Sequence, residues 1–221
     1  MDAFLKRFIW VIMVAPAVYL AVVWNRLPEK VAMHYSGLSG LPDRYGNKTG
    51  LLGVSALLLG MTILVYLLLT NIYRIDPKKY AADNKDRLRR IAYAVVIFLA
   101  GIHLLIIHSA GTGSMKFSMN YVLAATGLLF AVIGNYLPHL KQNYFAGLRI
   151  PWTLENAENW RRTHVLAGKL WFAGGLILAV LCLFLPALPA IIVFFTVMII
   201  ITVIPLVYSY RIFQQQKRTQ R

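Results

Sequence analysis

Six long hydrophobic stretches constrain this chain more than any other feature of its sequence. A helix of about 20 residues, within a range of roughly 17–25, crosses the ~30 Å hydrocarbon core of a bilayer. Six stretches meet that requirement without any Asp or Glu: residues 8–24, 51–72, 91–109, 121–137, 165–185 and 188–208. Hydrocarbon offers backbone polar groups no partner, so such stretches must satisfy them internally as helices. The sequence therefore predicts an all-α polytopic membrane protein with six transmembrane helices.

The composition agrees with a membrane environment. Hydrophobic residues make up 59% of the 221 residues and charged residues 14%, whereas a soluble domain carries about 25% charged residues. The single cysteine, Cys182, lies in an apolar run, which predicts a buried free thiol and no disulfide framework. The first stretch follows two basic residues, as in a signal peptide, but Trp24, Asn25 and Arg26 form no small-residue cleavage site. We expect it to be a retained span.

The basic residues predict the direction of the spans. Most of the 23 Lys and Arg residues lie at positions 6–7, 74–90 and 141–162 and in the C-terminal tail, segments that would share one face of the membrane. The positive-inside rule then predicts that both termini are cytoplasmic. The formal net charge of +15 would suit nucleic acid, but a basic inner rim matches anionic lipid headgroups. We expect membrane lipids as partners and no direct contact with nucleic acid.

The predicted spans divide the chain into two regions. Residues 1–74 would form a first helical hairpin with an extracytoplasmic loop at 25–50. Residues 75–221 would form a four-helix membrane region with a cytoplasmic loop at 139–164. The last two spans are separated only by Pro186 and Ala187, which predicts a tight helical hairpin.

The inner segment at 74–90 begins with Asp76 and Pro77, a cap followed by proline at its favoured helical position. We expect the third helix to start near Pro77. Two acidic–basic pairs at i,i+4 would lie along it: Asp83 with Arg87, and Asp86 with Arg90. The segment is either a solvated extension of the helix or a docking surface for an acidic cytoplasmic partner.

The outer segment at 25–50 is rich in proline and glycine, which favours turns over a long helix. It is the largest extracytoplasmic element, so a ligand from outside would meet it first. Its candidate contact residues are His34, Gly40, Asp43 and Lys48. Two metal-ligating side chains without a third do not predict a metal site. We expect His34 and Asp43 to be hydrogen-bonded into the turns of a folded cap.

His103 lies near the middle of the third predicted span. Ionisable residues within the bilayer are costly and are functional candidates by default. His108 follows five residues later, about 140° around a helix that turns ~100° per residue, so the pair does not predict a metal site. We expect His103 to hydrogen-bond a neighbouring span, for instance through Thr126 or Asn120.

The inner loop at 139–164 carries the most specific chemistry. Arg149 offers five donors in a rigid fork, and Trp152 and Trp160 are of the aromatic type found at membrane interfaces. Pro151 favours extended geometry in the residue before it, and Thr153 is expected to cap a helix that continues through Trp160 into the fifth span. Two interpretations remain open: the loop is purely architectural, or it also contacts a partner through Arg149.

The same helix should carry an ion pair between Glu158 and Arg162, which lie at i,i+4.

The loop also carries a family resemblance. Gly-Leu-Arg-x-Pro-Trp-Thr-Leu at 147–154, followed by a tryptophan and a basic pair, resembles the signature of the SdpI-type membrane proteins, which are bacterial immunity proteins. The resemblance begins near Gly134 and makes candidates of Asn135, Asn143, Gly147, Arg149, Pro151, Trp152, Thr153 and Trp160. A weaker similarity, to a short domain of unknown function, includes Leu27, Pro28, His34, Gly37, Gly40, Asp43, Tyr45 and Lys48.

The resemblance implies a function at the membrane. An immunity protein of this type protects the producing cell from a secreted, membrane-active peptide toxin. In some relatives it is also a signalling receptor that sequesters a transcriptional repressor at the membrane. The partners it implies are the toxin, the repressor and membrane lipids, with no cofactor.

Other classes of function remain as alternatives. The sequence has no His-Glu-x-x-His helix, Gly-x-Ser-x-Gly turn or phosphate-cradling glycine loop, so no enzyme is expected. A small-solute transporter or channel would suit interrupted helices, but the spans lack acidic residues and an evident repeat. An envelope sensor without a toxin ligand is the third possibility.

Overall fold

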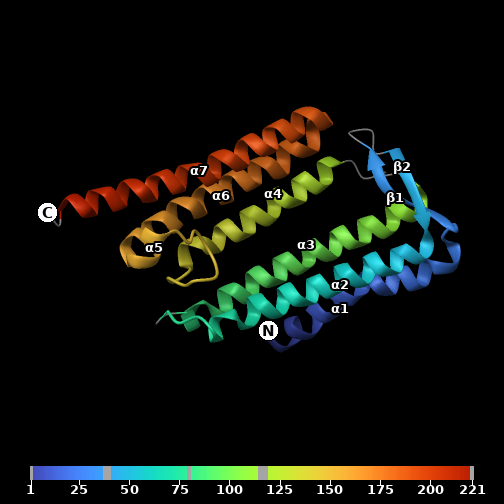
Figure 1. Cartoon of the computed structure of the whole chain (residues 1–221), viewed down its shortest axis with the longest axis horizontal. Helices are drawn as coiled ribbons and strands as arrows, with labels where there is room; N and C mark the ends of the chain where they lie inside the picture. Colours follow the sequence, from blue (N-terminus) through green and yellow to red (C-terminus); the bar gives the residue numbers. More distant parts are fainter. Residues whose placement is uncertain (1, 37–40, 79–80, 114–118, 220–221) are drawn as a thin grey trace. The chain divides into compact units, whose positions relative to one another are not determined.

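Residues 2–36, 41–78, 81–113 and 119–219 are described by the computed structural model (Figure 1). Within them, six helices are long and apolar enough to cross a membrane, so the predicted all-α polytopic fold is confirmed. They are α1 (Asp2–Val23), α2 (Lys48–Asn71), α3 (Lys85–Thr112), α4 (Met119–Tyr136), α6 (Ala157–Phe184) and α7 (Ala187–Thr219). A short helix, α5 (Pro151–Glu155), precedes α6.

Within the described residues, short 3₁₀ helices lie beside the ends of the long helices. They are η1 (Trp24–Arg26), η3 (Ile72–Arg74), η4 (Ala81–Asn84) and η5 (Leu137–His139). The helix predicted to start near Pro77 begins only at Lys85, after η4. Asp76 instead accepts a hydrogen bond from the Lys78 backbone N–H at 2.9 Å, which makes a local turn and no helix.

The pairs expected along that helix also differ. Arg87 donates to the backbone carbonyl of Asp83 at 2.7 Å, and Asp86 pairs with Arg89 at 2.8 Å. Arg87 thus reaches the backbone, not the carboxylate, of the residue four positions before it, and Asp86 meets Arg89 at i,i+3, a spacing that also brings side chains together on one face of an α-helix.

Two compact units make up the chain. The first contains residues 1–67 and 92–122, and the second contains residues 68–91 and 123–221. The division predicted from the sequence, into residues 1–74 and 75–221, is a division along the chain and not by contacts. It stays a prediction.

The first unit carries a β-hairpin where the sequence predicted turns. Strands β1 (Lys30–Ser36) and β2 (Leu41–Asn47) pair antiparallel, with irregular register beside His34 (Figure 1). An isolated two-stranded hairpin is marginal in water. Here Val31 is 1% exposed and packs in one cluster with Leu27 and Leu51. Burial of β1 against the helices therefore stabilises strands that the proline and glycine content did not suggest.

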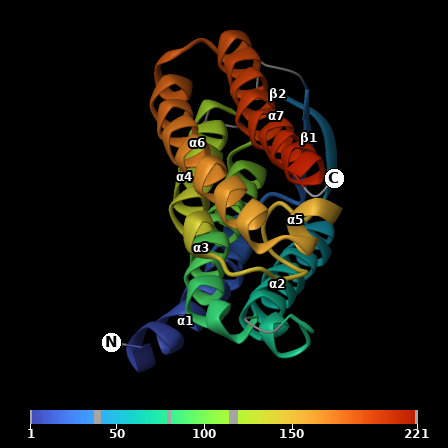
Figure 2. The ribbon, with the colours of Figure 1, turned by 90° about the vertical axis from the view of Figure 1, so that its left-hand side faces the viewer.

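The second unit is centred on α4, α6 and α7. Figures 1 and 2 both show α6 and α7 side by side, joined by the short turn at Pro186 that the sequence predicted. Leu185 is extended (φ −79°, ψ 149°), as expected before proline, and the Ala190 N–H donates to the Pro186 carbonyl at 2.9 Å. Cys182 is fully buried here, as predicted for a free thiol.

Glycines bring α4 and α6 into backbone contact. A Cβ atom on Gly134 would lie 2.5 Å from the Phe172 nitrogen, and one on Gly175 would lie 2.5 Å from the Gly127 oxygen. Small residues are enriched where membrane helices approach closely, because packing there must compete with lipid of equal apolarity.

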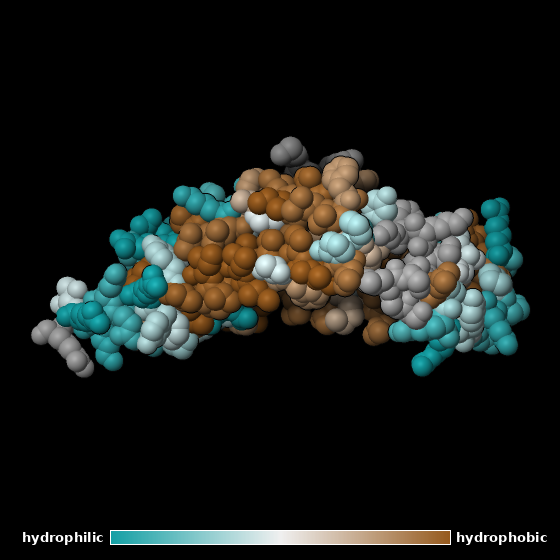
Figure 3. Space-filling model, turned by 90° about the horizontal axis from the view of Figure 1, so that it is seen from above, coloured by the Kyte–Doolittle hydropathy of each residue, from teal (hydrophilic) through white to brown (hydrophobic). Residues whose placement is uncertain are grey.

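The outer faces of the helices suit a bilayer. On α7, Ile192, Phe195 and Ile199 are 57%, 59% and 61% exposed. Figure 3 shows hydrophobic atoms over the middle of the visible face and hydrophilic atoms towards both of its ends. An apolar surface of this extent is uncommon on a soluble monomer, so lipid is the solvent that these side chains require.

Replacement of Gly175 by alanine should destabilise the second unit. The new methyl group would meet the backbone of α4 and force α4 and α6 apart, at a cost of about 1–3 kcal/mol. Gly101→Ala is the matched control, because a Cβ there has nothing within 4 Å and the change should be neutral or stabilising by up to ~1 kcal/mol. Thermal unfolding of both purified variants in detergent measures the difference; equal midpoints would contradict the close-contact interpretation.

Candidate functional site

The motif loop (residues 139–164) is tied to α7 by Trp152. The indole Nε1–H donates to Ser209 Oγ at 2.8 Å, and the ring stacks on Phe213 with a centroid distance of 5.7 Å. Trp152 also meets Tyr210 edge-on at 5.5 Å. A side chain expected to anchor the loop at a membrane interface thus anchors it to another helix.

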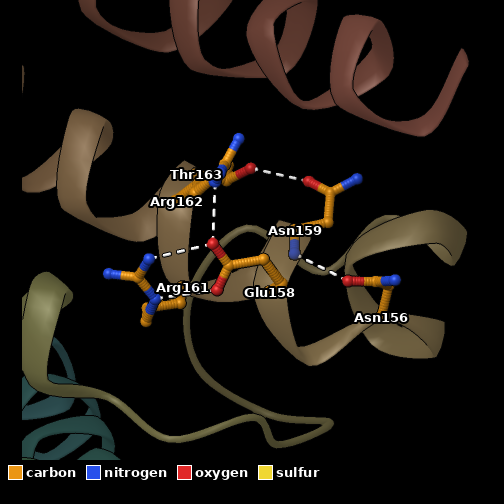
Figure 4. Close-up of polar contacts among 6 residues, drawn as sticks. All are labelled: Asn156, Glu158, Asn159, Arg161, Arg162 and Thr163. Carbon is orange, nitrogen blue, oxygen red and sulfur yellow. Dashed lines mark hydrogen bonds and ion pairs between the residues drawn. The ribbon is translucent and has the colours of Figure 1, made fainter. Parts of the chain in front are cut away.

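Asn159 is the centre of a buried polar network between α6 and α7. It is 0% exposed, and its Nδ2 donates to the Ser209 carbonyl at 3.1 Å. Its Oδ1 accepts from Ser209 Oγ at 2.9 Å and from Thr163 Oγ1 at 3.0 Å, the latter drawn in Figure 4. Each member of the network has a partner, so burial costs little and the geometry is strongly specified.

His164 fastens the loop from the other side. Its Nδ1 lies 2.8 Å from the Trp160 carbonyl, and its Nε2 accepts from the Leu148 N–H at 3.0 Å. A carbonyl can only accept, so these contacts together assign a neutral imidazole with its proton on Nδ1. Trp160 stacks on the ring at 3.9 Å and donates its own N–H to the Leu140 carbonyl at 2.8 Å.

Gly147 makes the close approach to His164 possible. Its φ is +104°, a conformation that glycine adopts readily and other residues rarely do. A Cβ at this position would press on the His164 ring. The glycine of the motif is therefore required by both its backbone geometry and its neighbour.

The predicted single helix from Thr153 into the fifth span is wrong. The chain forms α5, breaks at Asn156, and starts again as α6. Asn156 is extended (φ −125°, ψ 115°), and its side chain accepts from the Asn159 N–H at 2.8 Å, so Asn156 is the N-cap (Figure 4). Thr153 is fully buried; its hydroxyl accepts from the Ile150 N–H at 3.2 Å and donates to the Leu148 carbonyl at 2.8 Å.

Two expectations for this part of the loop are confirmed. Ile150, before Pro151, is extended with φ −107° and ψ 153°. Glu158 pairs with Arg162 at 2.7 Å, and also with Arg161 at 2.9 Å (Figure 4). Both arginines are exposed, so these pairs contribute little stability.

Asn143 shapes the first half of the loop. It is 2% exposed, and its Oδ1 accepts from the backbone N–H groups of Phe145 and Ala146 at 2.9 and 2.6 Å. Its Nδ2 donates to the carbonyls of Lys141 and Ala146 at 2.9 and 3.1 Å. One buried amide thus satisfies a turn that contains no regular secondary structure.

The segment before α3 holds the loop in place. Asn84 is fully buried and exchanges two hydrogen bonds with the Lys141 backbone, at 3.0 and 2.8 Å. Asp76 accepts from the Tyr144 N–H at 2.8 Å, and Lys78 Nζ donates to the Leu154 carbonyl at 2.7 Å. The inner segment and the motif loop therefore form one structure.

Arg149 is exposed on this structure. Its Nη1 donates to the Tyr144 carbonyl at 2.9 Å, which closes the loop over five residues. Tyr144 and Phe145 beside it are 42% and 37% exposed, and the Lys78 ammonium lies 5.2 Å from the Tyr144 ring centre. The architectural interpretation is supported by the contact of Arg149 with the Tyr144 carbonyl. The partner-binding interpretation is supported because the Arg149 side chain is still exposed at the surface of the loop.

The remaining candidates lie apart from this network. Asn135 is exposed on the last turn of α4. In the first unit, His34 Nδ1 lies 2.7 Å from Asp43 Oδ1 across the hairpin, so the two are hydrogen-bonded to each other between strands. Lys48 pairs with Glu29 at 2.7 Å. Gly37 and Gly40 lie outside the described residues.

Tyr35 of the hairpin has a buried hydroxyl without a hydrogen-bond partner among the described residues. Burial, and secondarily the nearby Tyr45 phenol, raises the pKa of Tyr35 above its usual value. The described part of the chain holds no group of three metal-ligating side chains.

His103 hydrogen-bonds a neighbouring span, as expected, but through a different residue. Its Nε2 lies 2.8 Å from Ser55 Oγ of α2, so the partners suggested by the sequence, Thr126 and Asn120, were wrong. Both His103 and Ser55 are buried, at 2% and 5% exposed. His108 meets Tyr19 instead, at 3.4 Å, so the two histidines serve separate contacts.

The motif loop, α5, α6 and most of α7 coincide with a known family region. Residues 139–209 match the SdpI/YfhL protein family. We call these residues, 139–209, the SdpI/YfhL region because they are similar to that family. The predicted resemblance is thereby confirmed, and the buried network of Asn159 and Ser209 lies within that region.

Other comparisons extend the similarity. Residues 11–59, which include the β-hairpin, match a domain of unknown function, DUF1648. Over 188 residues the chain is 24% identical to the Immunity protein SdpI of Bacillus subtilis (strain 168). The aligned stretch covers 81% of this chain and 82% of that protein. No solved structure matches the chain.

Several residues that organise the SdpI/YfhL region were missed at the sequence level. Asn159 and Thr163 lie four residues apart on one face of α6, and His164 follows Thr163 directly, ahead of the apolar part of the helix. Ser209 directly follows a long apolar run. Polar residues grouped on one face beside apolar spans were the available signal, since such groups must find partners.

Substitution of Asn159 by leucine should destabilise the SdpI/YfhL region. The change leaves the buried Ser209 and Thr163 groups without their partner, at a cost of about 1–3 kcal/mol for each unsatisfied group. Asn135→Leu is the control, because this exposed asparagine lies outside the network and should change stability by less than about 0.5 kcal/mol. Thermal unfolding in detergent compares them. An unchanged midpoint for Asn159→Leu would show that the network does not stabilise the fold.

Proposed function

We propose that this protein is an integral membrane immunity protein that protects the cell producing it from a secreted, membrane-active peptide. The similarity to the Immunity protein SdpI over 81% of the chain carries this proposal. The six apolar helices support it, because the target of such a peptide is the membrane in which they would lie.

The outer hairpin is the first contact in this proposal. Leu41 and Tyr45 of β2 are 62% and 56% exposed, and Met33 of β1 is 37% exposed. The strands also carry Lys30 and the exposed Arg44. Apolar and aromatic side chains on a rigid hairpin give an apolar peptide a contact surface with little loss of side-chain entropy.

A groove in the first unit offers a second contact. It has a volume of about 610 Å³ and lies between α1 and α2, with apolar walls that include Leu20, Leu52 and Leu59. Ser55 and Asn25 add polar groups. A peptide held in such a groove leaves the lipid when its contacts with the protein are better than those with acyl chains, through packing and hydrogen bonds.

The motif loop supports a signalling role in the same proposal. Its exposed Arg149, Tyr144 and Phe145 combine the residue types enriched at protein interfaces. A cytoplasmic repressor held at this surface would be kept away from its DNA. Toxin contact and repressor contact would then use opposite ends of the spans.

Replacement of both Leu41 and Tyr45 by threonine should reduce protection. Threonine retains β-propensity but removes apolar contact area, and a loss of about 1.4 kcal/mol lowers affinity ~10-fold. Survival of a toxin-sensitive host that expresses each variant, exposed to the purified peptide, measures the effect at equal membrane levels.

Two controls separate the roles. Phe184→Thr removes an 82% exposed aromatic ring at the end of α6, which belongs to neither the hairpin nor the groove, and should leave protection intact. Arg149→Ala should also protect, while losing retention of the repressor. If the wild-type chain protects no better than an empty vector, the immunity proposal fails.

We further propose that both termini are cytoplasmic, on the strength of the basic residues around the motif loop and in the C-terminal tail. Protease added to intact cells should spare a C-terminal tag and remove it only after permeabilisation. Loss of the tag from intact cells would reverse the orientation and the roles given to the two ends.

A further inference from the structure

A charged cleft of about 420 Å³ lies in the second unit, beside the motif loop. One wall comes from η4 and the start of α3, and the other from the last turn of α4 and η5. The charged and polar residues on these walls are Asp83, Asp86, Arg87, Arg90, Asn135 and His139. The volume falls within the ~300–1,000 Å³ of small-molecule sites.

The first wall carries both signs of charge along one side. Asp86, Arg87 and Arg90 follow the i, i+1, i+4 spacing of one side of α3, and Asp83 of η4 lines the cleft beside them. Arg87 uses Nη1 for the Asp83 backbone carbonyl at 2.7 Å, and the Asp86 side chain remains 71% exposed despite its pair with Arg89. Guanidinium donors and carboxylate acceptors are therefore both available to a ligand.

Packing and hydrogen bonds join the second wall of the cleft to the first. Leu88, on the other side of α3 from the charges, is 2% exposed and packs with Leu137 and Leu140 in one cluster. The double hydrogen bond of Asn84 to the Lys141 backbone joins the same two segments. The cleft is therefore part of the packed structure of this unit.

The cleft lies where hydrocarbon gives way to headgroups. The apolar part of α3 begins at Ile91, directly after Arg90, and that of α4 ends at Leu137, between Asn135 and His139. A phosphate group bound there would remain joined to acyl chains in the bilayer core.

We propose that the cleft binds a phospholipid headgroup that carries both a phosphate and a primary ammonium. The forks of Arg87 and Arg90 match phosphate oxygens, and Asn135 and His139 line the other wall of the cleft. The carboxylates of Asp83 and Asp86 accept the N–H donors of the ammonium. A headgroup with phosphate alone leaves the carboxylates without a cation, and a trimethylated amine has no N–H to donate.

The test uses the purified full-length chain in detergent, with three lipids of identical acyl chains as probes. They are phosphatidylethanolamine, phosphatidylglycerol and phosphatidylcholine, and native mass spectrometry measures the bound fraction against lipid concentration. We expect phosphatidylethanolamine to bind at least ~10-fold more tightly than the other two. Equal binding of the three lipids would overturn the proposal.

Variants locate the site. Arg90→Gln and Asp86→Asn should each lower phosphatidylethanolamine binding about 10-fold, and Asp86→Asn should not lower phosphatidylglycerol binding. The controls Arg161→Gln and Glu158→Gln alter an exposed pair with the same i,i+3 spacing outside the cleft, and should bind as the wild type does. Circular dichroism and size-exclusion chromatography verify folding. Unchanged lipid binding in folded Arg90→Gln and Asp86→Asn would overturn the assignment.

A soluble competitor distinguishes a lipid headgroup from a free aminophosphate as the ligand of the cleft. Free phosphoethanolamine carries the same charged groups without acyl chains, and should compete at least ~10-fold less well than the lipid. Competition at equal concentration would overturn the lipid assignment in favour of a soluble aminophosphate. The outcome is independent of the immunity proposal, which is tested by host survival.

Discussion

The buried amide of Asn159 is the contact on which the arrangement of the motif loop, α6 and α7 depends. Between membrane helices there is no hydrophobic driving force, because lipid chains are as apolar as the side chains that would replace them. Hydrogen bonds and close packing then decide which helix faces meet. Asn159 bonds to Ser209 of α7 and to Thr163 of α6, and Ser209 in turn receives the indole of Trp152. One side chain thus sets the pairing of α6 with α7 and the position of α5.

Packing reinforces this arrangement. Gly134 and Gly175 allow backbone contact between α4 and α6, and Gly147 allows the loop to lie against His164. The loop is consequently supported from α6, α7 and the segment before α3. A base of this kind would favour the partner contact proposed for Arg149, since contacts held in place in advance cost less entropy on binding.

Some of this could be predicted from the sequence. The six spans followed from apolar length alone, and the Pro186 turn and the Glu158–Arg162 pair from local spacing. The helix start before α3 and the break at Asn156 could not be predicted, because Pro77 and Thr153 are locally good helix-start residues and tertiary contacts decided otherwise. Asn156 caps α6 by accepting from the Asn159 N–H, while the Asn159 side chain bonds to Ser209 of α7.

The hairpin and the partner of His103 show the same limit. Proline and glycine content predicted turns, yet burial of Val31 against Leu27 and Leu51 stabilises two strands. His103 was expected to bond outside its own helix, but which span supplied the hydroxyl depended on helix packing that no local pattern encodes.

Hydropathy and charge along the chain by themselves determined that this is a six-helix membrane protein with a distinctive loop, because the transfer of a segment into hydrocarbon depends on that segment's own residues. Only the tertiary structure decided which polar side chains meet, since a hydrogen bond between α6 and α7 joins residues 50 positions apart and requires a defined helix rotation.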